Sequence, residues 1–287
     1  MPVGGRPTVR SRRLGAALKT YRLAAKMDQV QAAEVIAAHQ TRVSRIETGH
    51  VSARPLEIRA MLDAYGVRDL EVRQKLEELS RQSKRRGWWL EHAAHLRPDY
   101  LDHIALEDDA TYIRQWQPAL VPGLLQTPTY AEAVIAAGPG YVAPEVLEQL
   151  VKVREGRQAK IGEGGASYTA ILWEAVITQP LVHFDIHRQQ LTAILEIGER
   201  KNVTVQVLPF SAGALAATTS AFSSFSFDSE PVVEAVTLEN LRGTSVLEAP
   251  EDLTAYANMY DLLRSAALAP DASARLIRDV WRNMKEE

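Results

Sequence analysis

The stretch HQTRVSRIETGH, residues 39–50, decides the fold of the front of the chain. Read as a helix, it places Val43 and Ile46 three residues apart on one face, where both can pack against other elements. Most of the other side chains, among them Gln40 and Arg42, donate or accept hydrogen bonds and point elsewhere. Gly49 fits the residue that follows a helix. The pattern predicts a short docked helix that presents a polar face to solvent.

Four further helical patterns surround this stretch. Apolar residues recur every three or four positions over 12–27, and Asp28 can cap a helix over 29–36. Pro55 fits the first turn of a helix that stops at Gly66, and leucines mark another over 69–83. The sequence predicts a five-helix bundle over 12–83, preceded by a disordered basic arm over 1–11 that is rich in Gly and Pro.

The charge of the chain is divided unevenly. Residues 1–86 hold 18 Lys and Arg against 9 Asp and Glu, a balance of +9, whereas the whole chain has a net charge of -3. A basic front and an acidic rear indicate that only the front meets a polyanion. The chain has no cysteine, which excludes disulfides and thiolate metal sites and fits a reducing compartment. No apolar run is long enough for a membrane span.

Two helices separated by a tight turn form the helix-turn-helix layout, in which the second helix enters the DNA major groove. A glutamine amide can pair with adenine, arginine with guanine, and a threonine methyl can contact thymine. The predicted DNA-reading side chains are Gln40, Thr41, Arg42, Ser44 and Arg45. The alternative is an amphipathic helix pair with a solvated polar face.

The arginines before and at the start of the first predicted helix are a second candidate contact with DNA. Arg12 and Arg13, together with Arg6 and Arg10, are predicted to reach the DNA backbone or the minor groove. The alternative is a tail that only increases solubility.

The segment MDQVQAAEVIAAHQTRVSRIETG, residues 27–49, resembles the lambda-repressor/Cro-like family, the xenobiotic-response-element class of bacterial regulators. The resemblance implies that Gln29 binds a DNA phosphate and braces Gln40, and that Glu47 pairs with Arg22. Ala37 stands where the family usually has glycine. If the backbone there is left-handed, alanine costs about 1 kcal/mol. Asp28 replaces the usual Ser or Thr cap and places a carboxylate near phosphate.

A different style of sequence follows residue 86, with short alternating or apolar runs that are typical of strands. We expect a linker over 84–106 and a mixed α/β or α+β effector domain over 107–287, large enough for its own core. The predicted strands are 168–176, 203–208, 222–227 and 232–238. The predicted helices are 107–115, 129–137, 144–160, 186–200, 253–268 and 272–285.

Three segments of the rear, GWWLEH (87–92), the long run 98–135 containing QPALVPGLLQTPTYA, and NVTVQVLPFSAGA (202–214), resemble the C-terminal domain of actinobacterial regulators such as WhiJ-like proteins. The resemblance implies a small partner protein encoded by a neighbouring gene, in an arrangement compared with toxin–antitoxin pairs. A sensing or partner-binding role follows by analogy.

Large aromatic residues of the rear and of the junction are candidates for a ligand or partner pocket, with ordinary core packing as the alternative. They are Trp88, Trp89, Trp116, Tyr168 and Trp173. A second set consists of carboxylates that could in principle form a metal-dependent nuclease site, although their spacing does not require one. They are Glu107, Asp108, Asp109, Glu174, Asp185, Glu196 and Glu199. His183 and His187 lie close together with Asp185 between them, but no cysteine or further ligand is in range to complete a metal site. We therefore expect no enzyme, no metal and no cofactor.

Taken together, these patterns predict a sequence-specific, DNA-binding transcriptional regulator of the cytoplasm and nucleoid. One reading motif buries too little surface for useful specificity, so we expect a homodimer on a palindromic double-stranded operator. The rear domain would dimerise, sense a ligand or receive a partner. The alternative is an antitoxin-like interaction protein that binds a small neighbour-encoded partner and regulates its own operon. No membrane partner is expected.

Overall fold

The computed structural model describes residues 8–82, 87–138, 142–227, 232–240 and 243–284. The chain divides into two compact units, Met1–Trp88 and Trp89–Glu287. In the described residues, no helix is long and apolar enough to cross a membrane.

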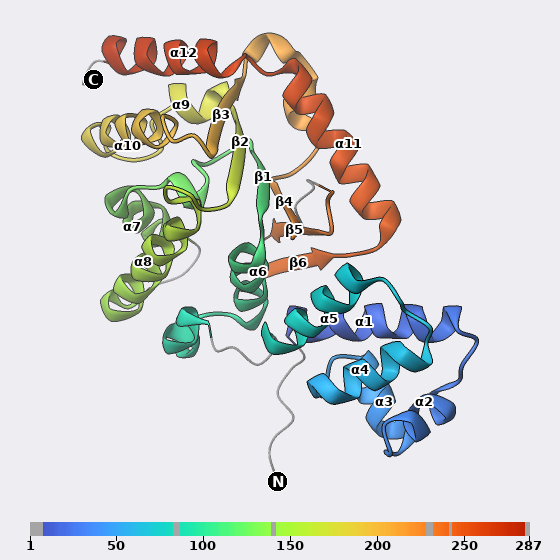
Figure 1. The fold of residues 1–287 in the computed structure, drawn as a ribbon. Coiled ribbons are helices and arrows are strands. Elements are labelled where there is room, and N and C mark those ends of the chain that lie inside the picture. Colours follow the sequence, from blue (N-terminus) through green and yellow to red (C-terminus); the bar gives the residue numbers. More distant parts are fainter. Residues whose placement is uncertain (1–7, 83–86, 139–141, 228–231, 241–242, 285–287) are drawn as a thin grey trace. The chain divides into compact units, whose positions relative to one another are not determined.

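Unit 1 is a bundle of five helices (Figure 1). They are α1 (Val9–Ala24), α2 (Gln29–Val35), α3 (Gln40–Glu47), α4 (Pro55–Ala64) and α5 (Leu70–Gln82). The predicted five-helix bundle is therefore confirmed. Each helix contributes aliphatic side chains to one core, whose buried members include Leu14, Leu18, Ala32, Val43, Ile46, Ile58, Met61, Leu62 and Leu76.

The first helix begins earlier than predicted. Thr8 is its N-cap, and its side chain accepts a hydrogen bond of 3.2 Å from the backbone N–H of Ser11. Val9 is buried in the first turn. Residues 8–11 were predicted to belong to a disordered arm, and this is wrong because the Thr8 cap and the buried Val9 make them part of the helix. The rest of the predicted arm lies outside the described residues.

Unit 2 contains a six-stranded mixed sheet in the order β3-β2-β1-β4-β5-β6. The strands are β1 (Tyr112–Gln117), β2 (Ser167–Trp173), β3 (Val203–Leu208), β4 (Phe222–Ser226), β5 (Ala235–Asn240) and β6 (Gly243–Leu247). β1, β2 and β3 are parallel neighbours, whereas β4, β5 and β6 continue from β1 as an antiparallel meander. The long connections between parallel strands carry helices, as parallel pairing requires.

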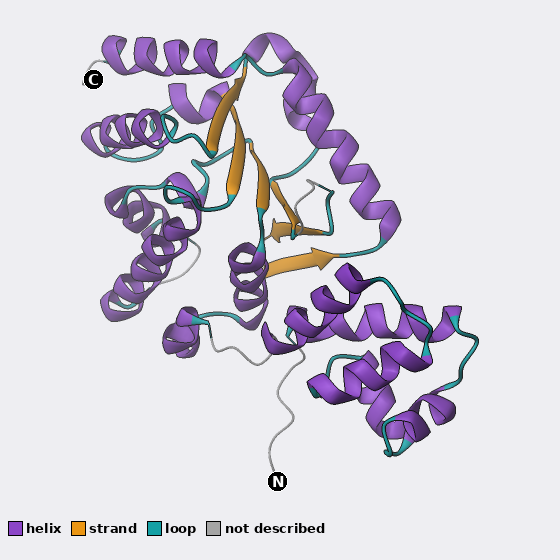
Figure 2. Cartoon of the chain, viewed as in Figure 1, coloured by secondary structure: helices purple, strands orange, loops and turns teal. Residues whose placement is uncertain are grey.

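Helices cover both faces of this sheet (Figure 2). The longer ones are α6 (Pro98–Asp109), α7 (Pro128–Ala136), α8 (Pro144–Gln158), α10 (Phe184–Ile197), α11 (Pro250–Ala266) and α12 (Pro270–Asn283). The short ones are α9 (Glu174–Thr178) and the 3-10 helices η1 (Trp88–His95), η2 (Gly123–Leu125), η3 (Ala159–Ile161) and η4 (Phe210–Ala217). Tyr260 and Leu263 of α11 pack in one buried cluster with Trp116 and Phe222 of the sheet. The predicted fold of the rear, a mixed domain of helices and a sheet, is therefore confirmed.

A buried polar cluster ties α6 and α8 to the sheet. The Arg157 guanidinium donates to both carboxylate oxygens of Glu107, at 2.8 and 2.7 Å, and also to the Tyr100 hydroxyl. Arg157 also lies 3.0 Å from Nε2 of His103, whose Nδ1 is 2.9 Å from the Thr237 hydroxyl. Because arginine only donates, His103 must accept at Nε2 and carry its proton at Nδ1. The cluster gives five side chains defined partners in the interior.

The start of unit 2 differs from the sequence prediction. The predicted linker 84–106 contains η1 and most of α6 in its described part. The predicted helix 107–115 is wrong, because α6 ends at Asp109 and β1 begins at Tyr112. In β1 the side chains alternate between faces, with Gln115 bonded to Tyr168 and Trp116 in the α11 cluster. The strand β6 was not predicted.

Candidate nucleic-acid interface

The helix pair α2–α3 begins with a capping box. Oδ1 of Asp28 accepts hydrogen bonds from the backbone N–H groups of Val30 and Gln31, each at 2.8 Å. Oε1 of Gln31 accepts in return from the backbone N–H of Asp28, at 2.9 Å. Asp28 therefore caps the helix as predicted, and the carboxylate is used by the backbone.

The turn between the two helices is left-handed at Ala37, where φ is 50°. The backbone N–H of Ala38 donates to the Ala33 carbonyl at 2.9 Å, which closes the end of α2. Because the backbone is left-handed here, Ala37 is expected to cost about 1 kcal/mol relative to glycine.

The helix α3 packs on the bundle through Val43 and Ile46, and both residues are buried. Gln40, Thr41 and Arg45 lie on its exposed side. A helix places residues four apart on one face, so Thr41 and Arg45 form the centre of the side that faces away from the core. The predicted polar face is present in this part of the structure.

Close packing of α1 on α3 fixes the position of α3. A Cβ on Gly15 of α1 would lie 2.3 Å from the carbonyl oxygen of Ile46, so only glycine permits this approach. Gly49, at φ 76°, ends the segment, and a Cβ there would lie 2.8 Å from the backbone nitrogen of Arg12. At both positions, backbone atoms of a neighbouring segment therefore leave no room for a side chain.

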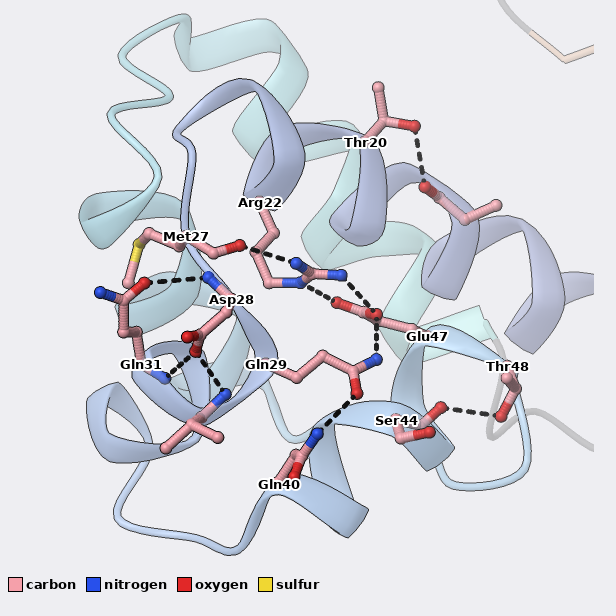
Figure 3. A network of polar contacts seen from close by, with 12 residues as sticks. Thr20, Arg22, Met27, Asp28, Gln29, Gln31, Gln40, Ser44, Glu47 and Thr48 are labelled. Carbon is pink, nitrogen blue, oxygen red and sulfur yellow. Dashed lines mark hydrogen bonds and ion pairs between the residues drawn. The ribbon is translucent and has the colours of Figure 1, made fainter.

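A chain of polar side chains runs from the interior to the surface of the helix pair (Figure 3). Arg22 donates to both oxygens of Glu47, at 2.6 and 3.1 Å, and both side chains are buried. Nε2 of Gln29 donates to Glu47 at 2.9 Å, and Oε1 of Gln29 accepts from Nε2 of Gln40 at 3.4 Å. The Arg22–Glu47 pair that the resemblance implied is therefore present.

This chain fixes the orientation of the two amides. An ionised Glu47 can only accept, so Gln29 must turn its Nε2 inward and its carbonyl toward Gln40. Hydrogen bonding to Glu47 raises the pKa of Arg22 above its ordinary value, although burial opposes the shift. Gln40 keeps one N–H and its carbonyl oxygen for a ligand, which are the donor and acceptor that adenine requires.

Arg42 lies at the flank of this face and is engaged by α4. Its Nε and Nη2 donate to the two oxygens of Glu57, at 2.9 and 2.8 Å. Ser44 is half-buried, and its carbonyl oxygen accepts a hydrogen bond of 2.8 Å from the Thr48 hydroxyl. The structure thus joins Gln29 to Gln40 and leaves Thr41 and Arg45 on the exposed side of α3. It holds Arg42 against another helix.

Arg12 and Arg13 lie in the first turns of α1 and not on an arm. The backbone of Arg12 is adjacent to Gly49, beyond the carboxyl end of α3. These arginines are therefore at the opposite end of the helix from Gln40. Arg6 lies outside the described residues.

The five aromatic residues predicted to form a pocket are distributed over separate places. Trp116 is buried in the α11 cluster and Trp173 packs against it, whereas Trp89 packs with Ile104 in another cluster. Tyr168 is buried on the other side of β1, where its hydroxyl donates to Gln115 at 2.8 Å. Trp88 is exposed at the first position of η1. A shared pocket is therefore wrong, because the strand alternation sends Tyr168 and Trp116 to opposite faces.

The seven carboxylates considered for a nuclease site do not come together as one group in the structure. Glu107 is paired with Arg157 in the interior, and Glu174 accepts the backbone N–H of Phe210 at 2.6 Å. Asp185 lies 3.7 Å from His183 on the surface. His187 is buried, and burial lowers its pKa. Among the residues described, no group of three or more His, Asp or Glu could hold a metal ion.

Comparison with known families agrees with the division into two parts. Residues 13–76 match a helix-turn-helix domain, so the front of the chain belongs to the class of DNA-binding regulators. Residues 100–279 match the family described as "Domain of unknown function (DUF5753)". That match covers more than half of the chain, which therefore belongs to the DUF5753 family. No curated protein and no solved structure matches the chain.

Proposed function

We propose that the protein is a sequence-specific transcriptional regulator that reads double-stranded operator DNA with α3. The observation that carries the proposal is the exposed face of α3, on which Gln40, Thr41 and Arg45 project from a helix docked by Val43 and Ile46. A helix of this kind fits the major groove, and these side chains have the donors, acceptors and methyl group that distinguish base pairs.

The chemistry of each contact follows from the side chain. The free donor and acceptor of Gln40 suit adenine, the fork of Arg45 suits guanine, and the methyl of Thr41 suits thymine. Gln29, which braces Gln40, is assigned to a phosphate through its remaining N–H. Its replacement would then weaken binding to all sequences alike, since phosphate contacts carry no sequence information.

The assembly that we propose is a homodimer on a palindromic operator, with half-sites one helical turn, about 34 Å, apart. The rear domain would mediate dimerisation and the response to a ligand or protein partner. We propose a cytoplasmic, nucleoid-associated protein of the xenobiotic-response-element class with a WhiJ-like rear domain. It would act through binding alone, without catalysis, metal or cofactor.

An antitoxin-like role is the second candidate. It rests on the resemblance of the rear domain to regulators encoded beside a small partner protein. The function would then be to bind that partner and to repress the shared operon. Co-purification of a small neighbour-encoded protein in fixed stoichiometry favours this role.

Selection from a random double-stranded DNA library tests the main proposal. The full-length protein should enrich a palindromic sequence, and Gln40→Ala should relax the preference at one position of each half-site, with a loss of about 1–3 kcal/mol. Gln74→Ala, which truncates an exposed glutamine of α5 in the same unit, is the matched control for folding. No enrichment by the wild-type protein, or an unchanged preference in Gln40→Ala, contradicts the proposal.

A further inference from the structure

The pair formed by Arg42 and Glu57 joins the recognition helix to α4. Both guanidinium–carboxylate hydrogen bonds are short, and the two side chains are 30% and 14% exposed. A two-point contact of this kind fixes the orientation of the guanidinium plane as well as its position. Arg42 is therefore held in one place by a partner that occupies two of the three guanidinium nitrogens.

Glu57 is itself fixed by a second contact. One of its carboxylate oxygens accepts the backbone N–H of Arg54, at 2.7 Å, at the start of α4. Burial would raise the pKa of Glu57, but the hydrogen bonds from Arg42 and Arg54 hold it below its ordinary value. The carboxylate is therefore charged and anchored at neutral pH.

The position of Arg42 on α3 agrees with an anchoring role. Each residue advances a helix by about 100°, so Thr41 and Arg45 lie opposite Val43 and Ile46, while Arg42 lies toward one flank. Arg45 is exposed, and within the part of the chain that the structure describes its guanidinium has no carboxylate partner. The two arginines of α3 thus differ in both direction and engagement.

The other flank of α3 has a corresponding brace. Gln40 is held through Gln29 to the buried Glu47 of the same motif. Arg42 is held through Glu57 to α4. The recognition helix is therefore fixed on one side to α2 and on the other side to α4, with Thr41 and Arg45 between the two braces.

We propose that Arg42 is a positioning residue, locked by Glu57 to set the angle of the recognition helix, and that Arg45 is the arginine that reads a base pair. This assignment rests on the proposed function. It makes Glu57, an acidic residue in a DNA-binding unit, a determinant of affinity through Arg42. The loss of either partner should tilt α3 and weaken binding to every sequence, whereas the loss of Arg45 should change the preferred sequence.

The test compares the full-length wild type with Arg42→Ala, Glu57→Ala, the double variant and Arg45→Ala. Selection from a random duplex library gives the preference of each, and titration of the selected duplex gives its affinity. We expect Arg42→Ala and Glu57→Ala to lose affinity by the same factor, about tenfold, with no further loss in the double variant. Their preferred sequence should be unchanged, and only Arg45→Ala should relax one base pair per half-site.

Thermal unfolding without DNA provides the second readout. The double variant should be no less stable than Glu57→Ala, which already loses both the Arg42 pair and the hydrogen bond from the Arg54 backbone N–H. Its loss should therefore be smaller than the sum of the two single losses, which measures the coupling of the pair directly. Arg42→Lys, which keeps the charge but loses the two-point contact, should recover only part of the affinity. A changed base preference in Arg42→Ala, or full affinity in Glu57→Ala, overturns the assignment. A wild-type protein that enriches no sequence instead refutes the proposed function, and independent effects on stability refute the lock alone.

Discussion

Each unit of the protein contains a buried arginine–glutamate pair among its described residues, and these two pairs have different surroundings. Arg22–Glu47 in unit 1 is continued by Gln29 and Gln40 to the exposed face of α3. Arg157–Glu107 in unit 2 is enclosed by Tyr100, His103 and Thr237. The same ion pair therefore supports a binding surface in one unit and joins helices to a sheet in the other. The role of such an ion pair is therefore indicated by the further hydrogen bonds that its two side chains and their neighbours make, and not by the ion pair alone.

The largest effect is expected from breaking the enclosed pair. Arg157→Leu leaves Glu107 charged in the interior, which should lower the free energy of unfolding by about 3–5 kcal/mol. Urea unfolding followed by the fluorescence of the buried tryptophans measures the loss. Arg264→Leu, which removes an exposed partner of Asp261, is the matched control and should change stability by less than about 1 kcal/mol. If both variants lowered the free energy of unfolding equally, the enclosed pair would contribute no more to stability than an exposed pair.

A smaller loss is expected from the pair that reaches the surface. Arg22→Leu leaves Glu47 one donor, the Gln29 amide, so the cost should be about 2–3 kcal/mol. It should also weaken DNA binding, because Glu47 without Arg22 is less firmly positioned and therefore holds Gln29 and Gln40 less firmly. Arg59→Leu removes an exposed partner of Glu77 in the same unit and serves as the control. Stability lost with DNA affinity retained would separate this pair from the site.

Acid provides a comparison between the wild type and a single variant of the enclosed pair. Burial opposes ionisation of Glu107, but Arg157 holds its pKa well below the ordinary value. A carboxyl with a depressed folded-state pKa contributes stability above its unfolded pKa, and that contribution is lost as pH falls through the folded pKa. Glu107→Gln should therefore be less stable than the wild type at pH 7 and should lose less stability between about pH 4.5 and 2. Parallel pH profiles of unfolding free energy would contradict this.

The resemblance to a known family implied the first pair, whereas the second pair was not predicted, for a physical reason. Arg22 and Glu47 belong to a local motif whose spacing is set by one helix-turn-helix geometry, and the sequence of that motif also predicted the Asp28 cap. Arg157 and Glu107 lie 50 residues apart and meet only when β1 and β2 pair. A helix was predicted over 107–115, yet its last residues belong to the strand β1, in which Gln115 contacts Tyr168 on one face of the sheet and Trp116 contacts the α11 cluster on the other. Long-range pairing of this kind leaves no local pattern.

The smallest effect concerns the turn that separates the two helices of the motif. Ala37 has a φ of 50°, and glycine adopts this conformation without strain, so Ala37→Gly should raise the stability of unit 1 by about 1 kcal/mol. Gly66→Ala is the matched opposite, since Gly66 has a φ of 72° and open space for a methyl group, and it should lower stability by a similar amount. Hydrogen exchange resolved by segment measures both changes. Protection should change in α1–α5 and stay constant in the strands β1–β3, because the strain is local to one unit. If the protection of β1–β3 changed together with that of α2 and α3, the two units would unfold as a single cooperative structure. The different roles assigned to the two buried pairs would then be contradicted.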